Sequence, residues 1–130
     1  MVAPSCVTHP SGMCVSVLIV DDSESFIRAA TELLRLRGYD VLGHASSAEQ
    51  AVLRAAELAP DAILLDVHLP DRDGVDLAAQ LCRRQQAPNV LLTSSDGQAV
   101  DDDLVLSCAA AGFVAKADLP TADLAAYLKG

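Results

Sequence analysis

The chain contains few basic residues and no long apolar run. Lys and Arg number 9 against 18 Asp and Glu, so the formal net charge is −9, and the basic residues form no cluster. Direct binding to nucleic acid or to an anionic membrane is therefore disfavoured. No apolar stretch approaches the roughly 20 residues that a membrane helix needs, and the N-terminal residues lack the pattern of a secretion signal. We expect a soluble, cytoplasmic protein.

The four cysteines follow no zinc-binding spacing. Cys6 and Cys14 flank His9 near the N-terminus, but a fourth ligand is missing. Cys82 and Cys108 fall at apolar positions of predicted helices. Free thiols in a reducing compartment are therefore expected instead of a metal site or disulfides.

The length and composition indicate one folded domain. Apolar residues make up 52% of the 130 residues, which argues against disorder. A chain of this size buries roughly two thirds of its unfolded surface without help from metals or disulfides. No internal repeat, low-complexity run or interdomain linker is present. We expect residues 1–14 to form a flexible tail and residues 15–130 to form the domain, without an output domain of its own.

Apolar segments of strand length alternate with segments of helical periodicity. Strands are expected at residues 15–20, 39–44, 62–65, 89–92 and 113–115. Helices are expected near residues 26–35, 46–58, 75–82, 98–111 and 120–129. Signals for helix ends support these assignments: a capping box at Ser46 and Ser47 with Glu49 and Gln50, stops at Gly38, Pro60, Pro88 and Gly112, and a start at Pro120. The alternation predicts an α/β fold, a doubly wound parallel sheet with helices on both faces.

Polar side chains follow four of the predicted strands. They are Asp21 and Asp22, Asp66, Thr93, and Lys116. Because the carboxyl ends of parallel strands lie on one edge, these side chains should converge. Three carboxylates in one place repel one another, and Mg²⁺, which prefers oxygen ligands, would relieve that repulsion. The hydroxyl and the ammonium complete a cradle for an anion such as a phosphoryl group.

In this order and spacing the residues resemble the receiver domains of two-component response regulators, from Val15 to Gly130. The separations are 44 residues from Asp22 to Asp66 and 50 from Asp66 to Lys116. The matching positions are the acidic pair Asp21 and Asp22, then Asp66 with Leu69, Pro70, Asp73 and Gly74, then Thr93, and finally Phe113 and Lys116. The resemblance implies a flavodoxin-like (βα)5 fold with strand order 2-1-3-4-5.

The resemblance also implies a function for each site residue. Asp66 would accept a phosphoryl group from a sensor histidine kinase or a phosphotransfer protein. Asp21, Asp22, Asp66 and the backbone carbonyl of His68 would hold Mg²⁺, and Thr93 and Lys116 would stabilise the phosphoryl oxygens.

Thr93 and Phe113 would then act as the switch that changes a partner-binding face built from the fourth helix, fifth strand and fifth helix. The downstream protein is not identified by the sequence, and a phosphorylation-dependent homodimer is an open alternative. We expect a phosphoacceptor protein, not an enzyme, with intrinsic self-phosphorylation and self-dephosphorylation chemistry.

Structural interpretations of the same residues stay open. Asp21 and Asp22 would serve as a helix cap, Thr93 would cap a turn, and Lys116 would be a solvated surface residue. Phe113 would be a core aromatic. Other acids are interpreted as turn, cap and solvated-face residues: Asp71, Asp73 and residues 101–103.

The sequence departs from the family at Ala117, which follows the lysine where the family usually has proline, often after a cis bond. A cis bond before alanine would cost about 3 kcal/mol, so a different loop path is expected. The last helix also looks short. Three alternatives remain: a receiver-like interaction module that works without phosphorylation, the receiver part of a longer DNA-binding regulator, and a magnesium-dependent phosphatase. The phosphatases typically place a second Asp where this chain has His68.

Overall fold

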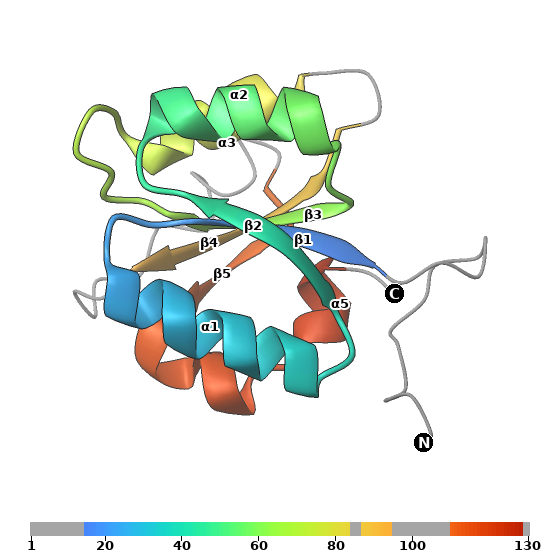
Figure 1. The fold of residues 1–130 in the computed structure, drawn as a ribbon. Coiled ribbons are helices and arrows are strands. Elements are labelled where there is room, and N and C mark those ends of the chain that lie inside the picture. The colour runs from blue at the N-terminus through green and yellow to red at the C-terminus, as the bar shows by residue number, and fades with distance from the viewer. Residues whose placement is uncertain (1–14, 84–86, 95–109, 129–130) are drawn as a thin grey trace.

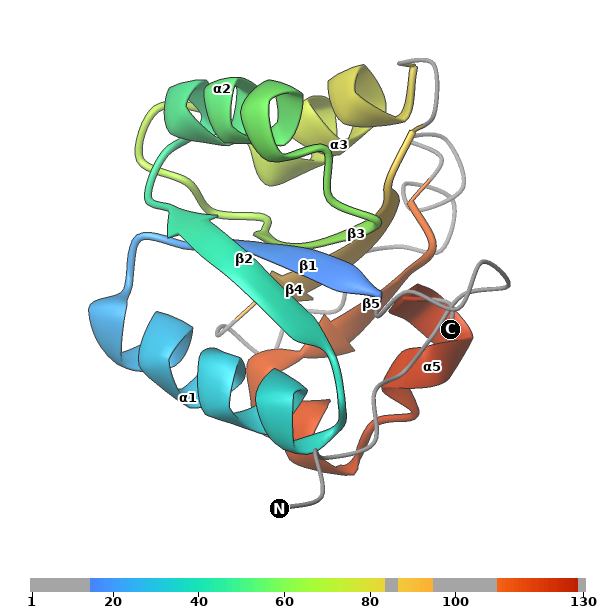
Figure 2. The ribbon, with the colours of Figure 1, turned by 45° about the vertical axis from the view of Figure 1, so that its right-hand side comes forward.

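One parallel sheet lies between two layers of helices in this computed structural model, which describes residues 15–83, 87–94 and 110–128 (Figure 1, Figure 2). The strands are β1 (Ser16–Val20), β2 (Asp40–Ala45), β3 (Ala62–Asp66), β4 (Asn89–Ser94) and β5 (Gly112–Ala115). The helices are α1 (Glu24–Leu36), α2 (Ala48–Leu58), α3 (Gly74–Cys82), the 3-10 helix η1 (Lys116–Thr121) and α5 (Leu124–Leu128). No helix within these ranges is long and apolar enough to cross a membrane.

The sheet has the order β2-β1-β3-β4-β5, as the family resemblance implied, and every neighbouring pair is parallel, as the alternation of strands and helices predicted. The pairing places the last residues of β3 and β4, Asp66 and Thr93, opposite each other. On the other side of β3, Leu65 pairs with Val20, so the residues after β1 emerge beside Asp66. The register therefore brings the predicted site residues to one edge.

Both faces of the sheet are covered, α2 and α3 lying on one side and α1 and α5 on the other (Figure 1). All five residues of β3 are buried. Ile63 and Leu65 face the α2 and α3 layer, whereas Leu64 faces the α1 and α5 layer. A strand apolar on both faces belongs in the middle of such a sheet, which explains why β3 has an unbroken apolar run before its terminal Asp66.

The helix starts agree with the sequence signals. The Ser47 hydroxyl accepts the N–H of Gln50 at 3.2 Å, and the Gln50 side chain accepts the N–H of Ser46 at 3.0 Å. Asp71, in the loop after β3, adds a contact that the sequence did not predict. Its carboxylate accepts the N–H groups of Ala48 and Glu49, and these hydrogen bonds lower the pKa of Asp71. The loop after Asp66 is thereby attached to the start of α2.

The prediction that Pro120 opens the last helix is wrong. Residues Lys116–Thr121 form η1 instead, and α5 begins at Leu124. Proline has no N–H to donate, and the carbonyls of Pro120 and Ala122 accept hydrogen bonds from the Arg37 guanidinium at the end of α1. This tertiary contact holds the segment in a turn, and no described peptide bond is cis, so the lysine is followed by a trans bond.

Other boundaries differ by a few residues. β4 continues through Thr93 to Ser94, two residues beyond its predicted end, and α3 ends at Cys82, well before Pro88. The predicted stop at Gly38 is confirmed, because this glycine has a φ of 90°. Several predictions lie outside the described residues: the tail of residues 1–14, including Cys6, His9 and Cys14, and most of the helix predicted at residues 98–111, including Cys108. Ala110 and Ala111, its last two predicted residues, are not helical.

Candidate functional site

The carboxylates of Asp21, Asp22 and Asp66 meet at the carboxyl edge of the sheet. One oxygen from each lies within 4.8 Å of the others. Asp21 is fully buried, Asp66 is 5% exposed and Asp22 is exposed. The predicted convergence of the acidic residues is therefore present in the fold, with the Asp22 carboxylate exposed to solvent and those of Asp21 and Asp66 buried.

Backbone N–H groups fix the two buried carboxylates. Asp21 Oδ1 accepts the N–H of Ser23 at 2.8 Å, and Asp66 Oδ1 accepts the N–H of His68 at 3.0 Å. Ser23 is also the N-cap of α1, so the same residue orients Asp21 and starts the helix. Each buried carboxylate therefore has one oxygen fixed by the backbone, and its second oxygen is turned toward the other charged groups.

Lys116 is the cation at the centre of this cluster. Its Nζ lies 2.6 Å from Asp21 Oδ2 and 3.4 Å from Asp66 Oδ2. Only 14% of its side chain is exposed, and Nζ lies 4.3 Å from the centroid of the Phe26 ring. Lys116 was predicted to stabilise a phosphoryl group on Asp66, but its Nζ lies closer to Asp21 than to Asp66. Its place in the sequence does not reveal this preference.

The acidity of Asp66 reflects opposing influences. Burial raises the pKa of the Asp66 carboxyl, and the neighbouring Asp21 carboxylate raises this pKa further. The hydrogen bond from His68 and the charge of Lys116 act in the opposite direction, but the net shift of the pKa is upward. A buried carboxylate beside a second carboxylate is typical of a functional cluster, because the fold must hold charge where it is least solvated.

The surroundings of Asp21 Oδ2 indicate whether the cluster can hold a metal ion. This oxygen is buried, and its contact with Lys116 Nζ at 2.6 Å is an ion pair; among the described residues it accepts no further hydrogen bond. A buried carboxylate that the backbone holds through one oxygen, near two further carboxylates, suits a hard divalent cation. The donor set therefore fits Mg²⁺, which binds through one or two carboxylates and keeps several waters.

Within the described ranges, no hydrogen bond or ion pair joins the side chain of Thr93 or Phe113 to the acidic cluster, although Thr93 lies opposite Asp66 in the sheet. Thr93 is fully buried, and its hydroxyl donates to the Leu65 carbonyl at 3.5 Å, the long limit of a hydrogen bond. Phe113 is half-buried and packs against the core that faces α2 and α3. His68 has an exposed side chain and bridges to Asp73 through the backbone.

Gly74 lies against the backbone of Asp66 and explains part of the sequence motif. Its N–H donates to the Val67 carbonyl at 2.9 Å. A Cβ added here would overlap the carbonyl oxygen of Asp66 and lie 2.6 Å from Cα of Val67. Only a glycine allows α3 to approach the strand end this closely.

Sequence reasoning missed the roles of Ser23 and Phe26. Ser23 stands directly before a helical segment, which is an N-cap signal, and its link to Asp21 could have been proposed on that basis. Phe26 lies at the start of the helix predicted near residues 26–35. Its contact with Lys116, 90 residues later in the chain, has no local sequence signal.

Comparisons with known proteins agree with this geometry. A family model of the response regulator receiver domain matches residues 17–129. A protein-glutamate methylesterase/protein-glutamine glutaminase from Archaeoglobus fulgidus is 35% identical over 109 residues, which cover 83% of this chain and 31% of the relative. The chain spans roughly a third of the length of the curated relatives it matches, 31% of one and 38% of another.

Two solved structures share the fold. The BeF3-activated N-terminal receiver domain of RstA from Klebsiella pneumoniae has a TM-score of 0.75 and 25% identity, covering 88% of this chain and 99% of that one. CheY in the CheX–CheY–BeF3–Mg²⁺ complex from Borrelia burgdorferi gives a TM-score of 0.73 at 23% identity, covering 88% and 90%, a likeness of fold alone.

The sheet order and the acidic cluster at its carboxyl edge define an α/β protein of the flavodoxin type with a CheY-like topology. The chain belongs to the family of response regulator receiver domains.

Proposed function

We propose that this receiver domain is a phosphorylation-dependent signalling switch in which Asp66 accepts a phosphoryl group. The donor is the phosphohistidine of a sensor histidine kinase or of a phosphotransfer protein. One observation carries the proposal: Asp66 ends a buried central strand with its carboxylate beside Lys116 and two further carboxylates. This is the arrangement that in-line phosphoryl transfer to a carboxylate requires, because the reaction depends on positioning and charge stabilisation.

The transfer forms one bond and breaks one. A carboxylate oxygen of Asp66 attacks phosphorus, the P–N bond of the phosphohistidine breaks, and the imidazole leaves with the electron pair and takes up a proton. The product is an acyl phosphate. The Lys116 ammonium, 3.4 Å from Asp66 Oδ2, is placed to pair with a phosphoryl oxygen.

Asp21, Asp22 and Asp66, with the backbone carbonyl of His68, are the residues that would hold Mg²⁺. The buried Oδ2 of Asp21, which forms an ion pair with Lys116 Nζ at 2.6 Å and lies in the cluster of three carboxylates, supports this assignment. Bound Mg²⁺ would neutralise charge on the transferring phosphoryl group, as it does in other phosphoryl transfers. The Asp21 carboxylate is held in advance through its other oxygen, Oδ1, which accepts the N–H of Ser23, so little reorganisation is needed.

The switch would begin at Thr93. Its long hydrogen bond to the Leu65 carbonyl is weak, so the hydroxyl can exchange this acceptor for a phosphoryl oxygen beside it. A shift of Thr93 would change the space next to Phe113, which pairs in register with Leu92. The phosphoryl group can move this equilibrium only by as much as its contacts differ between the two states.

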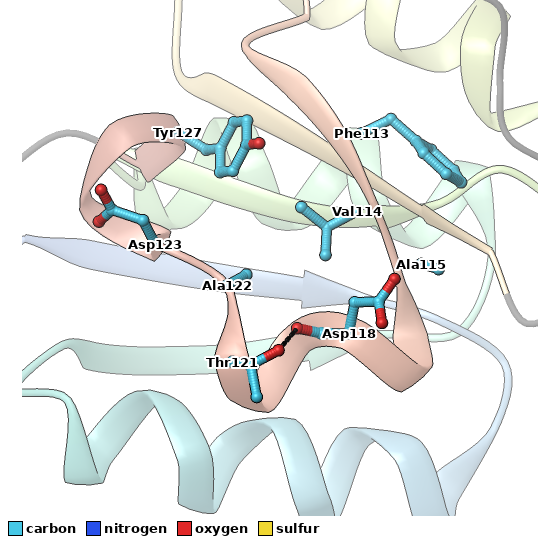
Figure 3. Close-up of a pocket in the computed structure, with 8 residues that line it drawn as sticks. All are labelled: Phe113, Val114, Ala115, Asp118, Thr121, Ala122, Asp123 and Tyr127. Atoms are coloured by element: carbon cyan, nitrogen blue, oxygen red, sulfur yellow. Dashed lines mark hydrogen bonds between the residues drawn. The ribbon is translucent and has the colours of Figure 1, made fainter.

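The face that would respond includes a pocket of about 480 Å³ beside β5, η1 and α5 (Figure 3). Its lining includes Phe113, Tyr127, Asp118 and Asp123. Because Phe113 also packs against the sheet core, its movement would reach this surface. Receiver domains interact with kinases and other signalling proteins, and we propose this face as the docking surface for the downstream protein. A phosphorylation-dependent homodimer is a second use of the same face, and a cytoplasmic setting suits both.

Magnesium-dependent modification by acetyl phosphate tests the function. Wild-type protein should gain the mass of one phosphoryl group, and the gain should require Mg²⁺ and then decay as the acyl phosphate hydrolyses. Asp66→Asn should abolish it. Asp40→Asn is the matched control, because it neutralises an exposed carboxylate at the opposite end of the sheet and should leave modification intact.

The same experiment identifies the alternatives. A wild-type protein that is neither modified by acetyl phosphate nor altered by beryllofluoride would favour an interaction module that works without phosphorylation. Repeated turnover of phosphoesters by each protein molecule would instead favour a phosphatase.

A further inference from the structure

Lys116 has an anchor in the structure that is not a carboxylate. Its Nζ lies over the Phe26 ring, 4.3 Å from the ring centroid. A lysine ammonium within about 6 Å of a ring face is attracted by the ring quadrupole. Phe26 belongs to α1, whereas Lys116 follows β5, so the contact joins two elements far apart in the chain.

The ring is fixed to the same local network as the acidic cluster. The N–H of Phe26 donates to the Ser23 hydroxyl at 3.4 Å, and the N–H of Ser23 donates to Asp21. Phe26 is half-buried and packs against the core that faces α1 and α5. The start of α1 therefore places Phe26 close to Asp21 independently of Lys116.

In the proposed function, the contact between Lys116 and Asp21 is lost when Asp21 binds a metal. The shortest contact of Lys116 is to Asp21 Oδ2, at 2.6 Å, and that oxygen is the one best suited to a metal. If Asp21 binds a cation, the ammonium must give up this contact because like charges repel. The Phe26 ring uses no carboxylate oxygen, so its attraction for the ammonium persists.

We propose that Phe26 is a positioning residue that retains the Lys116 ammonium beside Asp66 when Asp21 is engaged by a metal. The lysine ammonium is carried on a flexible four-carbon chain and would otherwise sample many conformations. Confining it over the ring keeps the charge within reach of the Asp66 oxygen, 3.4 Å away. This inference rests on the proposed function of Asp66, but its structural part can be measured separately.

A spectroscopic experiment tests the contact itself. The chain contains two lysines, so protein labelled with ¹³C-lysine gives few side-chain signals, and Lys116→Met assigns the relevant one. The ε-methylene protons of Lys116 should resonate upfield because the Nζ to which this carbon is bonded lies over the ring, and Phe26→Leu should remove this shift. The upfield shift should persist after Mg²⁺ is added to the wild-type protein.

A kinetic experiment tests the consequence. Phe26→Leu keeps an apolar side chain but removes the ring, and should lower the rate of Mg²⁺-dependent modification by acetyl phosphate about two- to fivefold, the range expected for a partly exposed cation–π contact. Phe26→Tyr restores a ring and should stay within about twofold of the wild-type rate. Leu33→Ala is the matched control, since Leu33 packs from α1 against the same core and should lower stability without changing the modification rate.

Three results would overturn the inference: identical Lys116 shifts in the wild type and Phe26→Leu, loss of the upfield shift on addition of Mg²⁺, or a Phe26→Tyr rate as low as that of Phe26→Leu. A wild-type protein that is never modified would instead refute the proposed function of Asp66. The ring-current shift would still decide whether Phe26 holds Lys116.

Discussion

Replacing Gly74 by alanine should damage both stability and phosphorylation, because the added methyl group would collide with backbone and not with a movable side chain. The new Cβ would overlap the Asp66 carbonyl oxygen and lie 2.6 Å from Cα of Val67. Reaching the 3.0 Å limit that real Cβ atoms observe requires a shift of about 0.4 Å at Val67 alone. Either α3 moves outward or the end of β3 moves, and β3 carries the acceptor.

The expected change in the free energy of unfolding follows from two opposing effects. Overpacking of a closely packed site costs about 1–3 kcal/mol. Alanine is a better helix former than glycine by up to about 1 kcal/mol, and this gain offsets part of the cost. We therefore expect Gly74→Ala to lower the free energy of unfolding by about 1–2 kcal/mol.

Urea denaturation followed by circular dichroism measures this change, and acetyl phosphate modification measures the effect on Asp66. Gly43→Ala is the matched control, because a Cβ at Gly43 would meet only Leu58 Cδ1, at an ordinary 3.9 Å. This control should be neutral or stabilising by about 0.5 kcal/mol, since glycine is unfavourable within a strand. A Gly74→Ala protein as stable as the wild type and modified at the wild-type rate would refute the reasoning.

Two further predictions concern stability. Ala59 ends α2 in the left-handed region, with φ 47° and ψ 58°, a conformation that glycine adopts more readily than alanine. Ala59→Gly should therefore stabilise the protein by about 0.5–1 kcal/mol, measured as a higher urea midpoint. An unchanged or lower midpoint would contradict this. Tyr39 is buried, and this burial, reinforced by the Asp123 carboxylate and opposed by Arg37, raises the pKa of its phenol above 10.0. The folded state therefore holds the phenolic proton more tightly than the unfolded state, and this contribution to stability is full below pH 10 and lost as the pH rises through the folded pKa. Unfolding measured across that range should show a steeper decline for the wild type than for Tyr39→Phe, and equal slopes would contradict it.

The fold was predictable because its signals are local and repeated. The apolar run before Asp66 is buried on both faces, so it could belong only to a central strand of a covered sheet. The alternation of strands and helices then implies that the strand ends share one edge. The convergence of Asp21, Asp22 and Asp66 follows from this rule and not from any property of the individual residues.

The errors concern contacts between segments distant in the chain. A helix was predicted to begin at Pro120. Instead, the Arg37 guanidinium at the end of α1 donates hydrogen bonds to the carbonyls of Pro120 and Ala122. Asp71 was interpreted as a turn residue, yet it holds the N–H of Ala48. Neither contact has a sequence period or motif, because each depends on where two loops meet after the sheet has formed.

The preference of Lys116 for Asp21 also has a consequence for how the site works. Three carboxylates and one ammonium leave an excess of negative charge at the place where Asp66 would accept another anion. Such a site resists an incoming phosphoryl group until positive charge is added. In the proposed function, engagement of Asp21 by a cation supplies that charge and also releases the ammonium toward Asp66. One binding event would then prepare both sides of the acceptor, which predicts that Mg²⁺ ends the contact of Lys116 with Asp21 while its contacts with Asp66 and the Phe26 ring persist.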